Sequence, residues 1–149
     1  MRLLSSFTLS LALMAPLGAR AAEEKDPTKA FQGEWTITDW RQGGATVPLA
    51  QLSTVRWAVD GARYDFALGD SREEGTVKVD ATQKPATIDL AITSGNDAGK
   101  NQVGIVRIEG DTVTFCFARP GADDRPTEFK TTADDNHILV TVKRVKKDD

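Results

Sequence analysis

The chain has 149 residues, a formal net charge of −3, one cysteine (Cys116) and one histidine (His137). This length suits one domain. A mildly acidic chain without a basic stripe is a poor nucleic-acid binder, a single cysteine excludes an internal disulfide, and one histidine without further cysteines argues against a zinc site.

The first residues carry the three parts of a secretory signal. Met1-Arg2 is a short positive start, Leu3 to Leu17 is largely apolar, and Ala19-Arg20-Ala21 fits the A-x-A cleavage pattern. The apolar run is too short and too rich in Ser and Thr to span a membrane, which needs about 20 apolar residues. We therefore expect a signal peptide over residues 1–21, export to the periplasm or beyond the cell, and a single domain over residues 22–149 that spans no membrane.

A short helical turn is predicted at the start of this domain. Asp26 can cap the free amide groups and Pro27 suits the first helical position. Gly33 can end the turn in a left-handed conformation. Phe31, its one large apolar side chain, is expected to plug against the core.

From Glu34 onward apolar and polar residues alternate. Trp35 and Ile37 share one face of the first run, with Thr36 and Thr38 on the other. One apolar and one polar face per strand is typical of an antiparallel sheet with one wet side. The same pattern predicts strands near 34–40, 53–59, 62–68, 73–79, 86–93, 102–109, 112–118 and 138–145, with a short ninth near 127–131.

Short links join these runs, and Asp60-Gly61 and Gly110-Asp111 are typical of tight hairpins. Successive strands joined in this way favour a meander. About eight strands are most stable when they close, since closure removes exposed edges. The predicted fold is all-β: an antiparallel up-and-down β-barrel of about eight strands with a short N-terminal helical turn.

Three stretches in this order carry a family resemblance: Phe31-Gln32-Gly33-Glu34-Trp35, the run from Asp80 to Leu90, and the region from Gly104 to Phe129. Together they resemble an uncharacterised family of exported domains that is abundant in planctomycete-type bacteria. The resemblance covers nearly all of the domain. It implies a fold and no reaction.

A wider resemblance is to lipocalins. In those barrels a Gly-x-Trp begins the first strand after a helical turn, and a late-strand Arg packs over the Trp. Gly33-Glu34-Trp35 has that position here, and Arg144 follows Val140 and Val142 on the same face. The resemblance implies that Phe31, Gly33, Trp35 and Arg144 form a structural set at the closed end of a lipocalin-like barrel.

The barrel interior is the first candidate site. An eight-stranded barrel is either just filled by side chains or holds one small ligand. A filled core is the simpler alternative, because close packing is usual in small interiors. The residues predicted to line the interior are Trp57, Tyr64, Phe66, Leu90, Ile105, Phe115 and Val140.

Two arginines have alternative interpretations. Arg107 shares a face with Ile105, but the opposite face of its strand is apolar too. If buried it needs a carboxylate or an anionic ligand, and if exposed it needs neither. Arg125-Pro126-Thr127-Glu128 is either a recognition loop or a rigid turn in which Arg125 and Glu128 pair.

No catalytic residue, metal site or cofactor is predicted. Cys116 lies between Phe115 and Phe117, which favours burial, and nothing local links it to His137 as a base. Asp134 and Asp135 lack the ligand spacing of a calcium loop. The sequence has neither a Gly-rich phosphate loop nor a Gly-x-Ser-x-Gly elbow.

These features predict an exported, non-enzymatic binding domain that holds a small apolar or amphipathic ligand in its barrel. The alternative is a protein-interaction module, such as an inhibitor of an exported protease or a cell-envelope scaffold, that binds an exported protein through loops at one barrel end. A hollow interior favours the first and a filled interior with apolar loops favours the second.

Overall fold

A computed structural model describes residues 27–52 and 54–146. The predicted signal peptide, its cleavage site and the Asp26 cap lie outside these residues. The elements are a 3-10 helix η1 (Pro27–Phe31), β1 (Gly33–Gln42), β2 (Ala45–Thr46), α1 (Leu49–Leu52), β3 (Val55–Asp60), β4 (Arg63–Leu68), β5 (Ser71–Asp80), β6 (Ala86–Ser94), β7 (Asn101–Glu109), β8 (Thr112–Phe117) and β9 (Ile138–Arg144).

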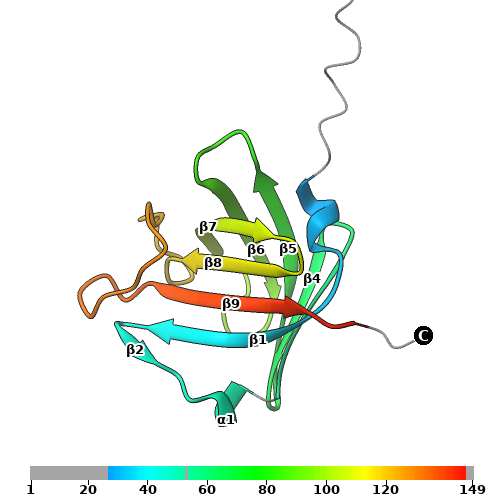
Figure 1. Ribbon diagram of the computed structural model, residues 1–149, viewed down its shortest axis with the longest axis horizontal. Helices are drawn as coiled ribbons and strands as arrows, with labels where there is room; N and C mark the ends of the chain where they lie inside the picture. The colour runs from blue at the N-terminus through cyan, green and yellow to red at the C-terminus, as the bar shows by residue number, and fades with distance from the viewer. Residues whose placement is uncertain (1–26, 53, 147–149) are drawn as a thin grey trace, which may run out of the picture.

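The strands form one antiparallel sheet that closes on itself (Figure 1). From β3 to β9 each strand pairs with the next along the chain, and β1 pairs with both β3 and β9. Eight strands therefore make a closed barrel, and β2 extends it beside β1. The predicted all-β barrel of eight strands is confirmed.

Each of the eight predicted strands is present, with bounds that differ by at most two residues at either end. The ninth strand expected near 127–131 is wrong. That stretch is held by individual bonds instead of a ladder: the Cys116 thiol donates to the Lys130 carbonyl at 3.4 Å, and Thr131 Oγ1 donates to the His137 carbonyl at 2.6 Å. The sequence analysis also missed β2, which follows a turn at Gly43-Gly44 with both residues at positive φ.

The helical turn closes one end of the barrel. Phe31 is fully buried beneath it and packs on Phe115, with ring centroids 5.8 Å apart, and on Trp57, with centroids 6.3 Å apart. Trp35 Nε1 donates to the Phe31 carbonyl at 2.9 Å. Phe31 is thus the plug that the sequence predicts.

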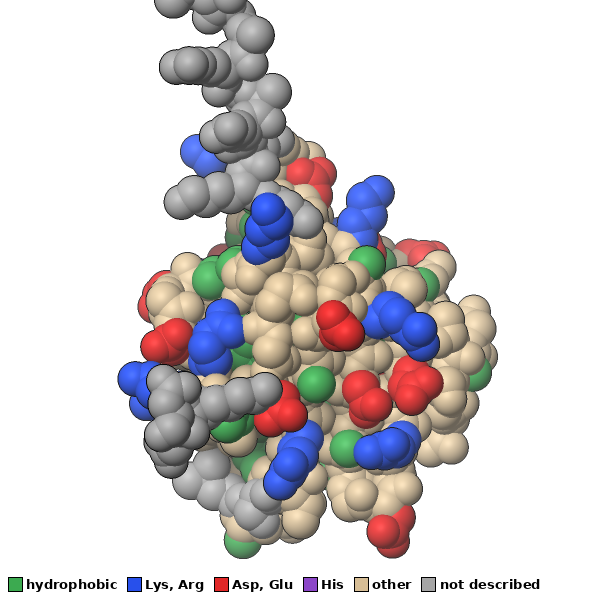
Figure 2. All heavy atoms as spheres, turned by 90° about the vertical axis from the view of Figure 1, so that its right-hand side faces the viewer, with side chains coloured by type: hydrophobic (Ala, Val, Ile, Leu, Met, Phe, Trp, Pro, Cys, Tyr) green, Lys and Arg blue, Asp and Glu red, His purple; other side chains and the backbone are tan. Residues whose placement is uncertain are grey.

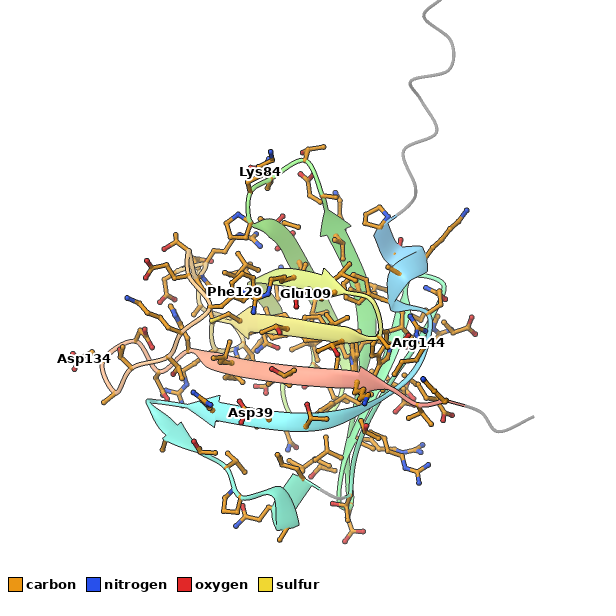
Figure 3. The ribbon with its side chains drawn as sticks, viewed as in Figure 1. Asp39, Lys84, Glu109, Phe129, Asp134 and Arg144 are labelled. Atoms are coloured by element: carbon orange, nitrogen blue, oxygen red, sulfur yellow. The ribbon has the colours of Figure 1, made fainter. Side chains whose placement is uncertain are left out.

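Arg144 lies over Trp35 at this closed end (Figure 3). Its guanidinium carbon is 4.4 Å from the indole centroid, and its Nη atoms donate to the carbonyls of Gln32 and Ala30. Trp35 and Arg144 are direct partners in the β1–β9 ladder. The predicted contact and the pairing of the first and last barrel strands are therefore both present.

Gly33 is required where the chain passes from η1 into β1. Its φ is +107°, a conformation that residues with a Cβ rarely adopt. A Cβ there would also lie 3.3 Å from Arg144 Nη1.

Residues 118–137, the β8–β9 segment, cover part of the outer barrel surface. Arg125 Nη1 donates to the carbonyls of Gly104 at 2.8 Å and Ile88 at 3.2 Å, and Arg125 Nη2 pairs with Asp89 at 2.7 Å. The predicted pair of Arg125 with Glu128 is wrong, because Glu128 pairs with Lys130 at 2.7 Å. Arg125 instead fixes the segment to β6 and β7.

The β8–β9 segment explains why both faces of β7 are apolar. Gln102, Gly104 and Val106 face the interior, as their pairing with Leu90, Phe117 and Phe115 requires. Ile105 therefore points outward, and it is 2% exposed because the segment covers it. The prediction that Ile105 lines the interior is wrong.

Arg107 lies on the same outer face and is exposed. Its Nε is 3.0 Å from Glu109 Oε1, and its guanidinium lies 4.7 Å from the centroid of the Phe129 ring. Of the two interpretations of Arg107, the structure has the exposed one.

Candidate functional site: a cavity inside the barrel

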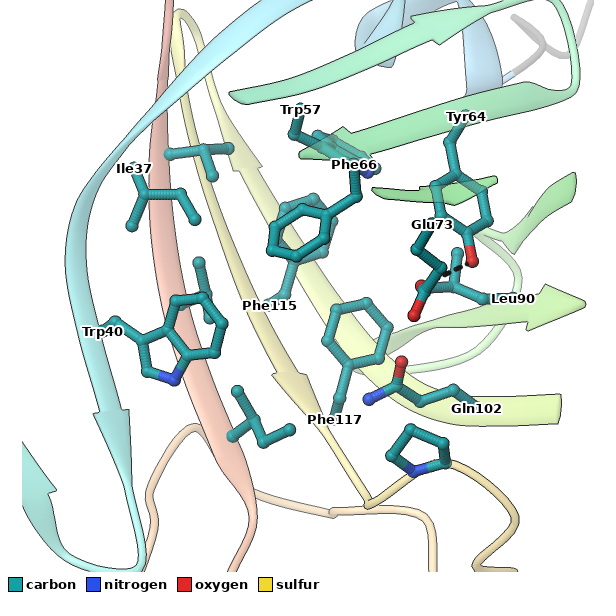
Figure 4. Close-up of a pocket in the computed structure, with 14 residues that line it drawn as sticks. Ile37, Trp40, Trp57, Tyr64, Phe66, Glu73, Leu90, Gln102, Phe115 and Phe117 are labelled. Carbon is teal, nitrogen blue, oxygen red and sulfur yellow. Dashed lines mark hydrogen bonds between the residues drawn. The ribbon is translucent and has the colours of Figure 1, made fainter. Parts of the chain in front are cut away.

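The barrel contains a cavity of about 180 Å³ that is partly open to solvent (Figure 4). Inward-facing side chains from every barrel strand, together with one residue of the β8–β9 segment, form its wall. The lining residues are Ile37, Trp40, Trp57, Tyr64, Phe66, Glu73, Leu90, Gln102, Phe115, Phe117, Pro120, Ile138, Val140 and Val142. Because Pro120 and Ile138 are among them, the cavity extends toward the end of the barrel opposite η1.

Aromatic rings make up much of the wall. Trp57 meets Phe115 edge to face, with centroids 4.9 Å apart, and Phe115 stacks on Phe117 at 5.5 Å. Trp40 and Phe66 are 6.3 Å apart. The rings hold one another in place, so the cavity is preformed instead of being assembled around a ligand.

Six of the seven residues predicted to line the interior do so, all except Ile105. The sequence analysis did not name Glu73 or Gln102. Both could have been found by extending the alternation of their strands. Glu73 is two residues before Gly75 and four before the inward Val77, and Gln102 shares the face of Gly104 and Val106.

Glu73 is a carboxylate inside this mainly apolar wall. The β4–β5 register pairs Glu73 with Phe66 and Gly75 with Tyr64, so all four lie on the inner face. The Tyr64 hydroxyl donates to Glu73 Oε1 at 2.8 Å. Burial raises the pKa of Glu73 above its ordinary value of 4.5, although the bond from Tyr64 opposes the shift.

Gly75 allows the Tyr64 ring to reach Glu73. A Cβ on Gly75 would lie 2.7 Å from Tyr64 Cε1 and 2.2 Å from the Ala91 carbonyl oxygen. The ring therefore lies directly over the β5 backbone. Burial, followed by the bond to Glu73, raises the pKa of the Tyr64 phenol well above its ordinary value of 10.0, so Tyr64 is a neutral hydrogen-bond donor.

Two further polar groups line the cavity. Gln102 is 8% exposed, and its Nε2 donates to the Ala118 carbonyl at 2.9 Å, which ties the wall to the start of the β8–β9 segment. Trp40 Nε1 is buried, and within residues 27–52 and 54–146 it has no hydrogen-bond partner. A buried donor of this kind destabilises the unliganded protein unless something accepts from it.

Cys116 does not belong to this cavity. It points outward beneath the β8–β9 segment and is fully buried, and burial raises the pKa of its thiol to about 11. His137 is engaged elsewhere, with Nε2 3.3 Å from Asp124 and Nδ1 3.6 Å from Asp135. Within the described part of the chain, no group of three or more His, Cys, Asp or Glu is placed to hold a metal ion.

On the visible surface of the described residues, neither acidic nor basic side chains are concentrated at the closed end. In Figure 2, which views the barrel from the side of η1, acidic and basic side chains are intermixed. No helix formed by the described residues is long and apolar enough to cross a membrane.

Comparisons of the chain with protein-family models, with curated proteins and with solved structures found no match. The resemblance of the sequence to an exported-domain family and to lipocalins therefore stays a prediction.

Proposed function

We propose that this protein is an exported, non-enzymatic binding domain that holds one small apolar or amphipathic molecule inside a lipocalin-like barrel. The observation that carries the proposal is the cavity of about 180 Å³ among inward-facing aromatic and aliphatic side chains. An engineered apolar cavity of about 150 Å³ in another protein binds benzene, so this one, which is larger and partly open to solvent, suits a single aromatic ring with a short substituent.

The cavity supports this function over the protein-interaction alternative. A domain that binds only through its loops gains nothing from an empty interior, and each unfilled volume in a core lowers stability by an amount that grows with its size. A ligand that fills such a volume would offset this loss of stability.

The test is calorimetric titration with 4-propylphenol, a molecule of ten non-hydrogen atoms with one hydroxyl. We expect a saturable one-to-one isotherm with the native chain. Val140→Phe places a ring in the cavity from the middle of β9, and binding should be lost while the fold is kept. Lys143→Phe adds the same ring on the exposed outer face of β9 and should bind as the native chain does.

Equal binding by the native chain and Val140→Phe would place the ligand outside the barrel and contradict the proposal. Absence of binding by the native chain would leave the cavity without the proposed role.

Export is a separate part of the proposal and depends on the signal pattern that ends at Ala19-Arg20-Ala21. N-terminal sequencing of the protein recovered from the periplasm or the medium should begin at Ala22, or within a residue or two. An exported protein that retains Met1 would contradict cleavage.

A further inference from the structure

The polar groups of the cavity narrow the class of ligand. Glu73 Oε1 accepts from Tyr64, whereas Oε2 has no hydrogen-bond partner among residues 27–52 and 54–146. None of the ion pairs in this part of the chain includes Glu73, and none of the described lining residues is Lys, Arg or His. The cavity therefore holds a carboxylate whose charge the protein does not neutralise.

The negative charge near Glu73 also favours binding of a cation beside its carboxylate. Asp97 is the charged neighbour that acts on Glu73, and its negative charge disfavours the ionised carboxylate further. Asp97 itself is paired with Lys100, whose Nζ lies 2.8 Å from Asp97 Oδ1. A half-buried carboxylate with no counter-charge is stabilised when a positive group binds beside it.

The aromatic side chains of the cavity wall also favour a positively charged ligand. The faces of aromatic rings carry partial negative charge and attract cations, and the effect is larger when water is excluded. Trp57 and Phe66 line the cavity between Glu73 and Trp40 (Figure 4). An anionic ligand, such as a fatty acid, would instead meet Glu73 without a compensating base.

We propose that the cavity binds a compact hydrophobic amine in its protonated form, with the ammonium group on Glu73 and the apolar part among the aromatic rings. This inference rests on the proposed function, because it names the class of ligand for the same cavity. Tyr64 acts as a positioning residue, since its hydroxyl holds Glu73 Oε1 and leaves Oε2 for the ligand.

Trp40 limits the ligand at the other side of the cavity, where its ring lies across from Glu73 (Figure 4). A ligand with an amine at one end and an aromatic ring at the other would place the amine on Glu73 and pack its ring against the aromatic wall. Tyramine has this arrangement and contains ten non-hydrogen atoms.

The experiment compares three probes built on the same 2-(4-hydroxyphenyl)ethyl group by calorimetry at neutral pH. Tyramine carries an ammonium, 4-propylphenol a methyl group in its place, and 3-(4-hydroxyphenyl)propanoate a carboxylate. The variants are Glu73→Gln, which keeps an acceptor for Tyr64, and Glu74→Gln, which makes the same change on the outer face of β5. Circular dichroism establishes that each variant is folded.

We expect the native chain to bind tyramine at least about tenfold more tightly than the propanoate. Glu73→Gln should weaken tyramine binding by about tenfold or more and change 4-propylphenol binding by less than about twofold, since a charge-assisted hydrogen bond is lost only with the amine. Glu74→Gln should change neither. If Glu73→Gln did not fold, the ranking of the three probes by the native chain would decide.

Two results would overturn the amine proposal and leave the proposed function intact: propanoate binding as tight as tyramine binding, or equal effects of Glu73→Gln on tyramine and 4-propylphenol, with both probes still excluded by Val140→Phe. Failure of all three probes to bind the native chain would overturn both proposals.

Discussion

At the scale of single residues, Glu73 combines the proposed binding role with a cost in stability. Because its pKa is raised in the folded state, its contribution to stability is full below the ordinary value of 4.5 and is lost as the pH rises through the folded-state pKa. At neutral pH the ionised group therefore destabilises the unliganded protein. A binding residue that lowers stability is a common feature of functional sites.

This predicts that Glu73→Gln stabilises the unliganded protein at neutral pH. The gain should be under about 1 kcal/mol, since solvent screens a half-exposed carboxylate. It should also grow as the pH rises from below 4.5 to neutral, in the direction that linkage requires. Urea denaturation across this range measures it, with Glu74→Gln as the control for removing a charge from the outer face of the same strand. A variant less stable than the native chain at neutral pH would be inconsistent with this account of Glu73.

Burial makes the thiol of Cys116 unreactive. Its thiol is fully buried and donates to the Lys130 carbonyl at 3.4 Å, and its pKa is raised from 9.0 to about 11. The thiolate, which is the reactive form, is therefore scarce at neutral pH.

Native-state labelling of Cys116 by a thiol reagent should be slower than labelling of the unfolded chain by roughly a hundredfold or more, because two pKa units reduce the thiolate fraction by that factor. The stability that depends on the neutral thiol should be present below pH 9 and lost as the pH rises toward 11. Cys116→Ala should lose about 1–2 kcal/mol at neutral pH and lack this alkaline component. Rapid labelling of the folded protein would contradict burial.

At the scale of elements, the approach of Tyr64 to β5 depends on the missing side chain of Gly75. Gly75→Ala would place a methyl group against the Tyr64 ring and the Ala91 carbonyl oxygen. We expect a loss of about 1–3 kcal/mol from overpacking and a displaced Tyr64. Urea denaturation measures the loss of stability, and weaker tyramine binding reports the displacement of Tyr64. Thr76→Ala on the outer face of β5 is the control, and an equal effect of the two changes would contradict the close approach.

The β7 strand shows where prediction from the sequence ends. Most of the barrel strands have one apolar and one polar face, so alternation assigns their inner sides. In β1 alternation fails, because a register shift between Ile37 and Asp39 turns Trp40 into the cavity. In β7 both faces are apolar, because the β8–β9 segment covers the outer one and buries Ile105. That segment is held by Arg125, whose partner Asp89 is 36 residues away in the chain, and no local pattern reports such a pair.

At the scale of the whole molecule, closure depends on the contact between the first and last barrel strands. The sequence predicted it from Gly33-Glu34-Trp35 and Arg144, because the two strands at the ends of a meander become neighbours when it closes. The sequence did not decide between a filled and a hollow barrel interior, since the summed volume of inward side chains does not show whether they meet. Glu73 could have been assigned to the cavity from its alternation with Gly75 and Val77.

A double-mutant cycle tests the closing contact. Trp35→Ala should destabilise by about 3–5 kcal/mol as a buried aromatic, and Arg144→Ala by less. Since Arg144 packs on the indole face, the two losses should be non-additive by about 0.5 kcal/mol or more. Trp35→Phe, which keeps an aromatic ring beneath Arg144, provides a milder version should Trp35→Ala fail to fold. Strict additivity would indicate that the two residues do not couple.

The central claim, that the barrel is hollow in order to hold a small molecule, is tested most directly by a crystal structure of the protein with bound 4-propylphenol. The account predicts one molecule inside the barrel, with its ring between Phe66, Phe115 and Val140, and with the side chains of the wall close to the positions they have in the unliganded protein. An interior filled by side chains, or a probe found only on the outer surface, would contradict it.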